Sequence, residues 1–150
     1  MKPCGLYQTT QALEGLPAGR FVYFHNHGNP GPGIYLPKAW VQNRADFHEN
    51  GTPVSESFIE SLRELPAEGL YRVTQAFFCC EKQCLKFDAE TLVQLGHNGQ
   101  ADAILFVPEL SPTGLTFPER GSAISADRLK HLIQLKISAR KAEPIAGLLH

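Results

Sequence analysis

Three of the four cysteines, whose thiols are the most reactive side chains of the sequence, lie close together near the middle of the chain. They are Cys79, Cys80 and Cys84. If residues 81–83 form the tip of a hairpin, Cys80 and Cys84 face each other across two strands, where Cβ atoms are about 4.5–5.5 Å apart. If the segment is helical instead, residues four apart also share one face. Either geometry brings the two sulfur atoms within reach of one metal ion or of a strained disulfide.

These thiols have three interpretations. A structural zinc site needs four ligands, usually in paired Cys or His groups. His25 and His27, two residues apart at a strand edge, would point to the same side and could complete a zinc site with Cys80 and Cys84, whereas Cys4 is remote in the sequence. The second interpretation is redox or nucleophilic chemistry at either hairpin thiol. The third is plain structure, with the cysteines in the core or beside a turn.

A glycine-rich loop after an apolar run offers a second candidate site. Backbone amides in such a loop can cradle an anion, and imidazole serves as an acid, a base or a ligand near neutral pH. The loop has neither the GxGxxG nor the GxxxxGK[ST] spacing of phosphate-binding loops. An exposed histidine beside a turn is also more often solvated than catalytic. The residues predicted to bind a ligand here are His25, Asn26, His27, Gly28 and Gly31.

Composition and charge exclude several classes of protein. The chain has 150 residues, 43% of them hydrophobic and 19% charged, which fits a single domain over residues 1–150. A net charge of −1 argues against nucleic acid as a partner, because such binding needs a positive surface. No stretch approaches the ~20 apolar residues of a membrane span. The N-terminus resembles no signal peptide, so we expect a cytoplasmic protein with reduced thiols.

Alternating apolar residues and frequent turns predict a mainly β fold at the margin of α+β. We expect a small open barrel or sandwich with two or three short helices. A hairpin should form around Asn98-Gly99, because both residues tolerate the positive φ of a two-residue type I′ turn. The predicted strands cover residues 20–25, 33–37, 69–80, 91–97, 100–107 and 133–137. The predicted helices cover residues 40–47, 57–65 and 127–132.

A faint internal repetition has two explanations. Residues 33–37 and 114–118 share a glycine–apolar–x–apolar–proline pattern, and residues 25–28 resemble residues 97–99. Short strands that end at proline often look alike, which is the simpler explanation. The other is that two related β-halves form one barrel or sandwich.

Three functional hypotheses follow from these observations. The chain has no HExxH, GxSxG or kinase motif, which favours a non-catalytic binding or accessory module. Such a module would contact a protein or a small molecule through residues 25–33 and could form a homo-oligomer. The second hypothesis is a zinc protein using Cys80 and Cys84 with His25 or His27; otherwise no cofactor is expected. The third is a cysteine-dependent enzyme or redox sensor.

Overall fold

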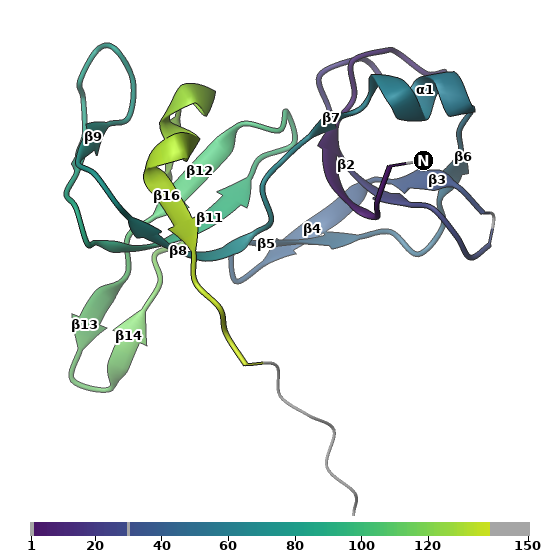
Figure 1. Cartoon of the computed structure of the whole chain (residues 1–150). Coiled ribbons are helices and arrows are strands. Elements are labelled where there is room, and N and C mark those ends of the chain that lie inside the picture. The colour runs from purple at the N-terminus through teal and green to yellow at the C-terminus, as the bar shows by residue number, and fades with distance from the viewer. Residues whose placement is uncertain (1, 30, 139–150) are drawn as a thin grey trace, which may run out of the picture.

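A computed structural model describes residues 2–29 and 31–138, and these residues form two five-stranded antiparallel sheets that lie side by side (Figure 1). Neither sheet closes into a barrel, and the predicted mainly β class is confirmed. The first sheet, in the order β6-β3-β2-β1-β7, consists of β1 (Gly5–Gln8), β2 (Phe21–His25), β3 (Gly33–Tyr35), β6 (Thr52–Pro53) and β7 (Arg63–Glu64). The second, in the order β15-β12-β11-β8-β16, consists of β8 (Gly69–Val73), β11 (Leu92–His97), β12 (Ala103–Phe106), β15 (Ser122–Ile124) and β16 (Leu132–Gln134).

Three hairpins and two short helices complete the described part of the chain. The hairpins are β4 (Pro37–Val41) with β5 (Arg44–Phe47), β9 (Phe77–Phe78) with β10 (Lys86–Phe87), and β13 (Glu109–Ser111) with β14 (Gly114–Thr116). The helices are α1 (Glu56–Ser61) and the 3₁₀ helix η1 (Ala126–His131). Among the described residues, no helix has the length and apolarity needed to cross a membrane.

The predicted hairpin around Asn98-Gly99 forms, but with a longer loop. Strands β11 and β12 pair His97 with Ala103, and Ala101 adopts a φ of +65°. The Asn98 side chain accepts hydrogen bonds from the backbone N–H groups of Gln100 and Asp102. These bonds stabilise a three-residue loop ending in a left-handed residue instead of the expected two-residue turn.

Three predicted elements differ in the structure. The helix expected over residues 57–65 ends at Ser61, and residues 63–64 form β7 instead. The helix expected over residues 40–47 is wrong, because Gln42 and Asn43 have φ values of 51° and 66° and turn the chain into the β4–β5 hairpin. The single strand expected over residues 69–80 is interrupted after Val73, and its second part becomes β9. The β4–β5 turn contains neither glycine nor proline, so the sequence carries no strong signal for it.

The two five-stranded sheets have the same topology. The equivalent strands are β1 and β8, β2 and β11, β3 and β12, β6 and β15, and β7 and β16. The β4–β5 hairpin corresponds to β13–β14, and helix α1 corresponds to η1. In the second repeat the β9–β10 hairpin lies in the connection between β8 and β11. The equivalent connection in the first repeat, between β1 and β2, contains the isolated Leu13–Leu16 bridge. The described chain is therefore a tandem repeat. This agrees with the explanation of the faint repetition by two related β-halves. The segments that correspond in the structure are, however, not the ones that looked alike in the sequence.

Sequence and hydrogen bonding confirm this correspondence. The runs GLYQTTQA, from Gly5, and GLYRVTQA, from Gly69, are identical at six of eight positions. The hydroxyl of Tyr7 donates to the carbonyl oxygen of Pro3 at 2.7 Å, and the hydroxyl of Tyr71 donates to that of Ala67 at 2.6 Å. The same fold is thus stabilised twice by equivalent contacts.

Each repeat has its own core, and a third cluster joins the two. The first core lies between its sheet and α1, and the second lies between its sheet, the β9–β10 hairpin and η1. The third contains Phe21, Leu65 and Ala101, with Ala45 and Phe47 of the β4–β5 hairpin packed against it. Trp40 of the same hairpin donates its indole N–H to the carbonyl oxygen of His97 at 2.8 Å. The first hairpin therefore packs between the repeats.

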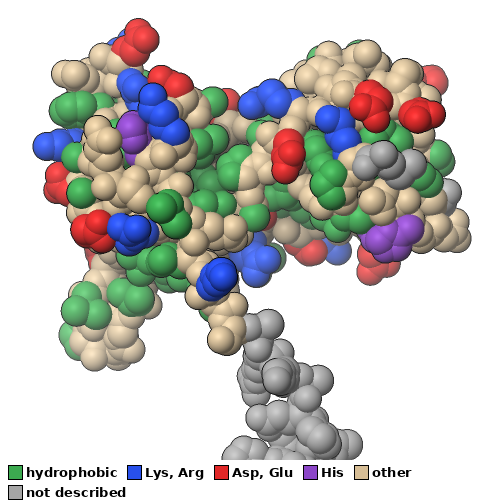
Figure 2. Space-filling view, in the orientation of Figure 1, with side chains coloured by type: hydrophobic (Ala, Val, Ile, Leu, Met, Phe, Trp, Pro, Cys, Tyr) green, Lys and Arg blue, Asp and Glu red, His purple; other side chains and the backbone are tan. Residues whose placement is uncertain are grey.

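The equivalent β13–β14 hairpin projects away from both sheets (Figure 1). Its Leu110 and Leu115, which correspond to Trp40 and Ala45, have exposed fractions of 84% and 56%. Figure 2 shows apolar side chains on this hairpin and interspersed Lys, Arg, Asp and Glu side chains over the visible face of the repeats.

Gly121 is expected to tolerate no side chain. A Cβ atom there would lie 2.5 Å from the carbonyl oxygen of Leu105, which is backbone and cannot move aside. We expect Gly121→Ala to lower the free energy of unfolding by about 1–3 kcal/mol, the usual cost of overpacking. Gly99→Ala is the matched control, because a Cβ atom at Gly99 meets no atom within 4 Å. Urea unfolding monitored by circular dichroism measures both variants, and equal midpoints for the two would contradict this expectation.

Candidate metal centre

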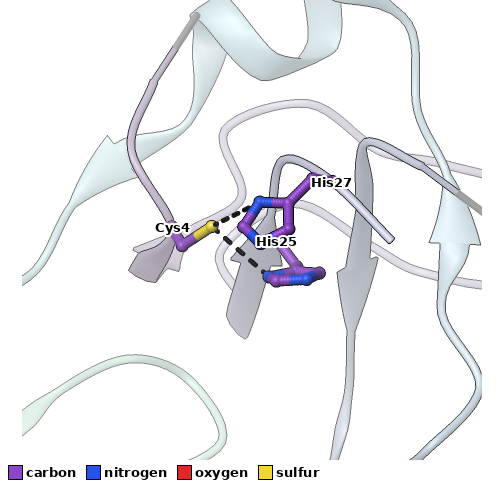
Figure 3. Close-up of side chains that lie close together, drawn as sticks. All are labelled: Cys4, His25 and His27. Carbon is purple, nitrogen blue, oxygen red and sulfur yellow. Dashed lines mark hydrogen bonds between the residues drawn. The ribbon is translucent and has the colours of Figure 1, made fainter. Parts of the chain in front are cut away.

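Three side chains of metal-ligand type converge at one end of the first sheet. Cys4 precedes β1, His25 ends β2, and His27 lies in the loop that follows (Figure 3). Their potential ligand atoms all lie within 4.8 Å of one another. The Cys4 Sγ atom is 3.3 Å from Nδ1 of His25 and 3.9 Å from Nδ1 of His27. This group could hold a metal ion.

The strand register explains why residues so far apart in sequence meet. Strands β1 and β2 pair Gly5 with Phe24, so the next pair outward is Cys4 and His25. The chain then turns, and the His27 ring lies with its centroid 4.0 Å from that of His25. Gly28 makes this turn possible, since its φ is +93° and a Cβ atom there would lie 3.3 Å from the His25 ring.

Asn26 connects the potential ligands. Its backbone N–H donates to Cys4 Sγ at 3.3 Å. Its side-chain Oδ1 accepts from the Cys4 thiol at 3.3 Å and lies 2.7 Å from His27 Nδ1. Its Nδ2 donates to the carbonyl oxygen of Lys2 at 3.1 Å, which fixes the carboxamide. Asn26 therefore orients both Cys4 and His27.

A groove of about 740 Å³ opens beside this group. Its aromatic side includes Tyr23, which stacks on His25 at a centroid distance of 6.2 Å and contacts Phe47 at 5.6 Å. Its acidic side includes Glu68. Burial raises the pKa of this carboxyl group, and a hydrogen bond from the Ala45 N–H lowers the pKa by a smaller amount. The Tyr23 pKa is also raised, chiefly by burial. The group thus borders a cavity with both aromatic and carboxyl walls.

The second repeat has no such ligand group among the described residues. At the positions equivalent to Cys4 and His25 it has Glu68 and Gly96, although a comparable groove of about 1110 Å³ is present. A Cβ atom at Gly96 would lie 2.8 Å from the carbonyl oxygen of Asn43. The tip of the β4–β5 hairpin therefore occupies, in the second repeat, the space that the imidazole of His25 fills in the first.

The structure separates the residues that the zinc hypothesis combined. His25, Asn26, His27 and Gly28 all lie at the ligand group, and Gly31 lies further along the same loop, with a φ of +99°. Cys80 and Cys84 lie instead at the tip of the β9–β10 hairpin of the second repeat, at the left of Figure 1, whereas β2 lies at the right. Within residues 2–29 and 31–138, the potential metal ligands that come together are Cys4, His25 and His27.

Sequence reasoning missed Cys4. It set this residue aside because 20 residues separate it from His25, yet the antiparallel pairing of β1 with β2 makes the two neighbours. The usable signal was the pair of apolar runs at residues 5–8 and 21–25, whose antiparallel alignment places Cys4 opposite the histidines.

Comparison with known proteins supplies no relative. No family model, no curated protein and no solved structure matches this chain. A functional proposal therefore has to come from the chemistry of the site.

Proposed function

We propose that this protein is a metal-binding module that holds one zinc ion through Cys4, His25 and His27. The observation that carries the proposal is the convergence of the three ligand atoms within 4.8 Å of one another. Thiolate and imidazole are ligands that suit zinc. This assignment keeps the two histidines of the zinc hypothesis and replaces Cys80 and Cys84 by Cys4.

The spacing of the ligand atoms supports zinc. Zinc–sulfur bonds of about 2.3 Å and zinc–nitrogen bonds of about 2.0–2.1 Å at tetrahedral angles require sulfur–nitrogen separations of about 3.6 Å. The separations of 3.3 Å and 3.9 Å in this protein lie on either side of that value.

The surroundings of the ligands support a built site. Metal ligands are usually oriented by hydrogen bonds from neighbouring groups. Asn26 supplies such bonds to Cys4 and lies within hydrogen-bond distance of His27. Cys4 and His25 are half-buried, and His27 is exposed, so the ion can enter from solvent.

Three protein ligands leave one coordination position of a tetrahedral zinc ion free. Zinc sites with three protein ligands keep the fourth position for water or a substrate, as catalytic sites do, whereas structural sites are closed by four protein ligands. The groove beside Cys4 and His25 offers space for such a fourth ligand. The proposed module therefore binds a small molecule with an oxygen or nitrogen donor at its metal.

Cobalt(II) binding tests this proposal. The full chain, prepared without a histidine tag, is titrated with Co²⁺, and its absorption should saturate at one ion per chain with a sulfur-to-cobalt charge-transfer band. Zn²⁺ should displace the cobalt. Cys4→Ser should abolish the charge-transfer band, whereas the matched control Cys84→Ser should retain it. Absence of saturable binding, or loss of the band in Cys84→Ser alone, would overturn the proposal.

A further inference from the structure

The β9–β10 hairpin places two cysteines opposite each other at its tip. Its register pairs Phe78 with Lys86, and the N–H of Cys79 donates to the carbonyl oxygen of Leu85 at 2.8 Å. The next pair outward is Cys80 and Cys84. The turn closes with a hydrogen bond of 3.0 Å from the N–H of Gln83 to the carbonyl oxygen of Cys80, and Gln83 has a φ of +55°.

The position of this pair in the ladder suits a disulfide. In an antiparallel ladder, hydrogen-bonded and non-hydrogen-bonded pairs alternate, and the side chains of a non-hydrogen-bonded pair lie closer together. Because the preceding pair, Cys79 and Leu85, is hydrogen-bonded, Cys80 and Cys84 form a pair of the closer kind. Non-hydrogen-bonded pairs have Cα separations of about 4.5 Å, at the lower end of the range of about 4.4–6.8 Å that is usual for disulfides.

The three neighbouring thiols differ in their exposure. Cys79 is buried, Cys80 is half-buried against the second core, and Cys84 is exposed. The sulfur atoms of Cys79 and Cys80 lie 3.6 Å apart. An oxidant in solution therefore reaches Cys80 and Cys84 before it reaches Cys79.

The electrostatics distinguish Cys80 from Cys84. The pKa of Cys80 is lowered, chiefly because the backbone N–H of Lys82 donates a hydrogen bond to its sulfur atom. The pKa of Cys84 is raised, chiefly because a negative charge on Cys80 disfavours a second thiolate beside it. Cys80 is accordingly the nucleophile and Cys84 the thiol that attacks it in turn.

We propose that Cys80 and Cys84 form a redox-active dithiol, which a peroxide oxidises to a disulfide across the hairpin tip. The Cys80 thiolate attacks one peroxide oxygen, the O–O bond breaks, and the leaving oxygen takes up a proton. The resulting sulfenic acid on Cys80 is attacked by Cys84. The S–S bond forms, the S–O bond breaks, and the departing hydroxide combines with the Cys84 proton as water. With hydrogen peroxide, two thiols are oxidised and one peroxide is reduced to two waters.

The base of the hairpin is anchored independently of its tip. Phe77 stacks on Phe87 at a centroid distance of 5.1 Å and on His131 at 5.5 Å. The N–H of Ser125 donates to the carbonyl oxygen of Cys79 at 2.9 Å. Oxidation should therefore stiffen the tip and leave the core unchanged. Because the hairpin belongs to the second repeat, this chemistry does not depend on the proposed zinc site.

Peptide mapping tests the proposal. The dilute full chain is treated with hydrogen peroxide, capped with iodoacetamide and digested with trypsin, which cuts after Lys82. A Cys80–Cys84 disulfide should join the peptides of residues 73–82 and 83–86, and reduction should separate them. Without peroxide, iodoacetamide at pH 7 should label Cys80 several-fold faster than Cys84, and fragmentation spectra distinguish Cys80 from Cys79.

Three serine variants give the controls. Cys79→Ser should form the linked peptides as the native chain does, whereas Cys80→Ser and Cys84→Ser should not. If Cys80→Ser links as readily as the native chain, or if the native chain forms only links between molecules, the proposed dithiol is wrong. Equal labelling rates for Cys80 and Cys84 would overturn the assignment of Cys80 as nucleophile.

Discussion

Cys4→Ser is expected to weaken zinc binding by more than about 100-fold. Loss of a hydrogen-bonding partner of a ligand typically costs 10–100-fold in metal affinity, and loss of the ligand itself should cost more. His25→Ala and His27→Ala should have effects of the same order, since each removes one of three ligand atoms that lie within 4.8 Å of one another. Asn26→Ala removes the carboxamide bonds but no ligand, so we expect about a tenfold loss.

Competition with a chromophoric chelator at fixed pH measures these affinities. His48→Ala is the matched imidazole control, because His48 is exposed and lies outside the ligand group. Its zinc affinity should equal that of the native chain. If Cys4→Ser and His48→Ala bind zinc with the same affinity, then Cys4 is not a ligand.

Acid is expected to destabilise the metal-free protein through His97. This side chain is 3% exposed, stacks on Phe21 at a centroid distance of 5.1 Å, and has no hydrogen-bond partner for either ring nitrogen among the described residues. Burial, and to a smaller extent the charge of Arg63, lowers its pKa from 6.5 to about 4. The folded state therefore holds His97 neutral at a pH where the unfolded chain takes up a proton.

The sign of the effect follows from this difference. Above pH 6.5 His97 is neutral in both states and contributes no pH dependence. As the pH falls from about 6.5 to 4, only the unfolded state binds the proton, so the free energy of unfolding decreases, by about 3 kcal/mol in total.

The His97→Phe variant isolates this contribution. Phenylalanine keeps the stack on Phe21 and cannot be protonated, so the variant should lose most of this pH dependence, whereas the control His48→Phe should keep it. Urea unfolding between pH 7.5 and 4, in the presence of a chelator, measures the three proteins. If the native chain and His97→Phe show parallel pH dependences, His97 is not the group responsible.

Local chemistry in the sequence predicted two of the three potential ligands of the candidate metal centre. The positions of His25 and His27 beside a glycine-rich turn marked them as ligands, because both residue type and local spacing are visible in one short segment. Cys4 could not be found in that way, since its proximity depends on the β1–β2 register. For Cys80 and Cys84 the sequence left a hairpin tip and a helix face open, and the structure shows the hairpin.

The fold shows the same division between local and non-local information. The mainly β class and the β11–β12 hairpin follow from alternation and turn residues. The β4–β5 hairpin does not, because Gln42 and Asn43 adopt positive φ values that are held by contacts with the second repeat: the Asn43 side chain donates to Gln94, which in turn donates to the carbonyl oxygen of Gln42. Such contacts cannot be read from a segment alone.

Gly96 and His25 occupy equivalent positions in the two repeats, but their surroundings differ. Gly96 must stay small, because the tip of the β4–β5 hairpin packs against that face. The corresponding face of the first repeat meets no such hairpin tip among the described residues. It is released from that steric demand, so bulky ionisable side chains can occupy it without cost to the packing between units. Equivalent positions of the repeated fold therefore differ in use: Gly96 accommodates the neighbouring hairpin, and His25 is a potential metal ligand.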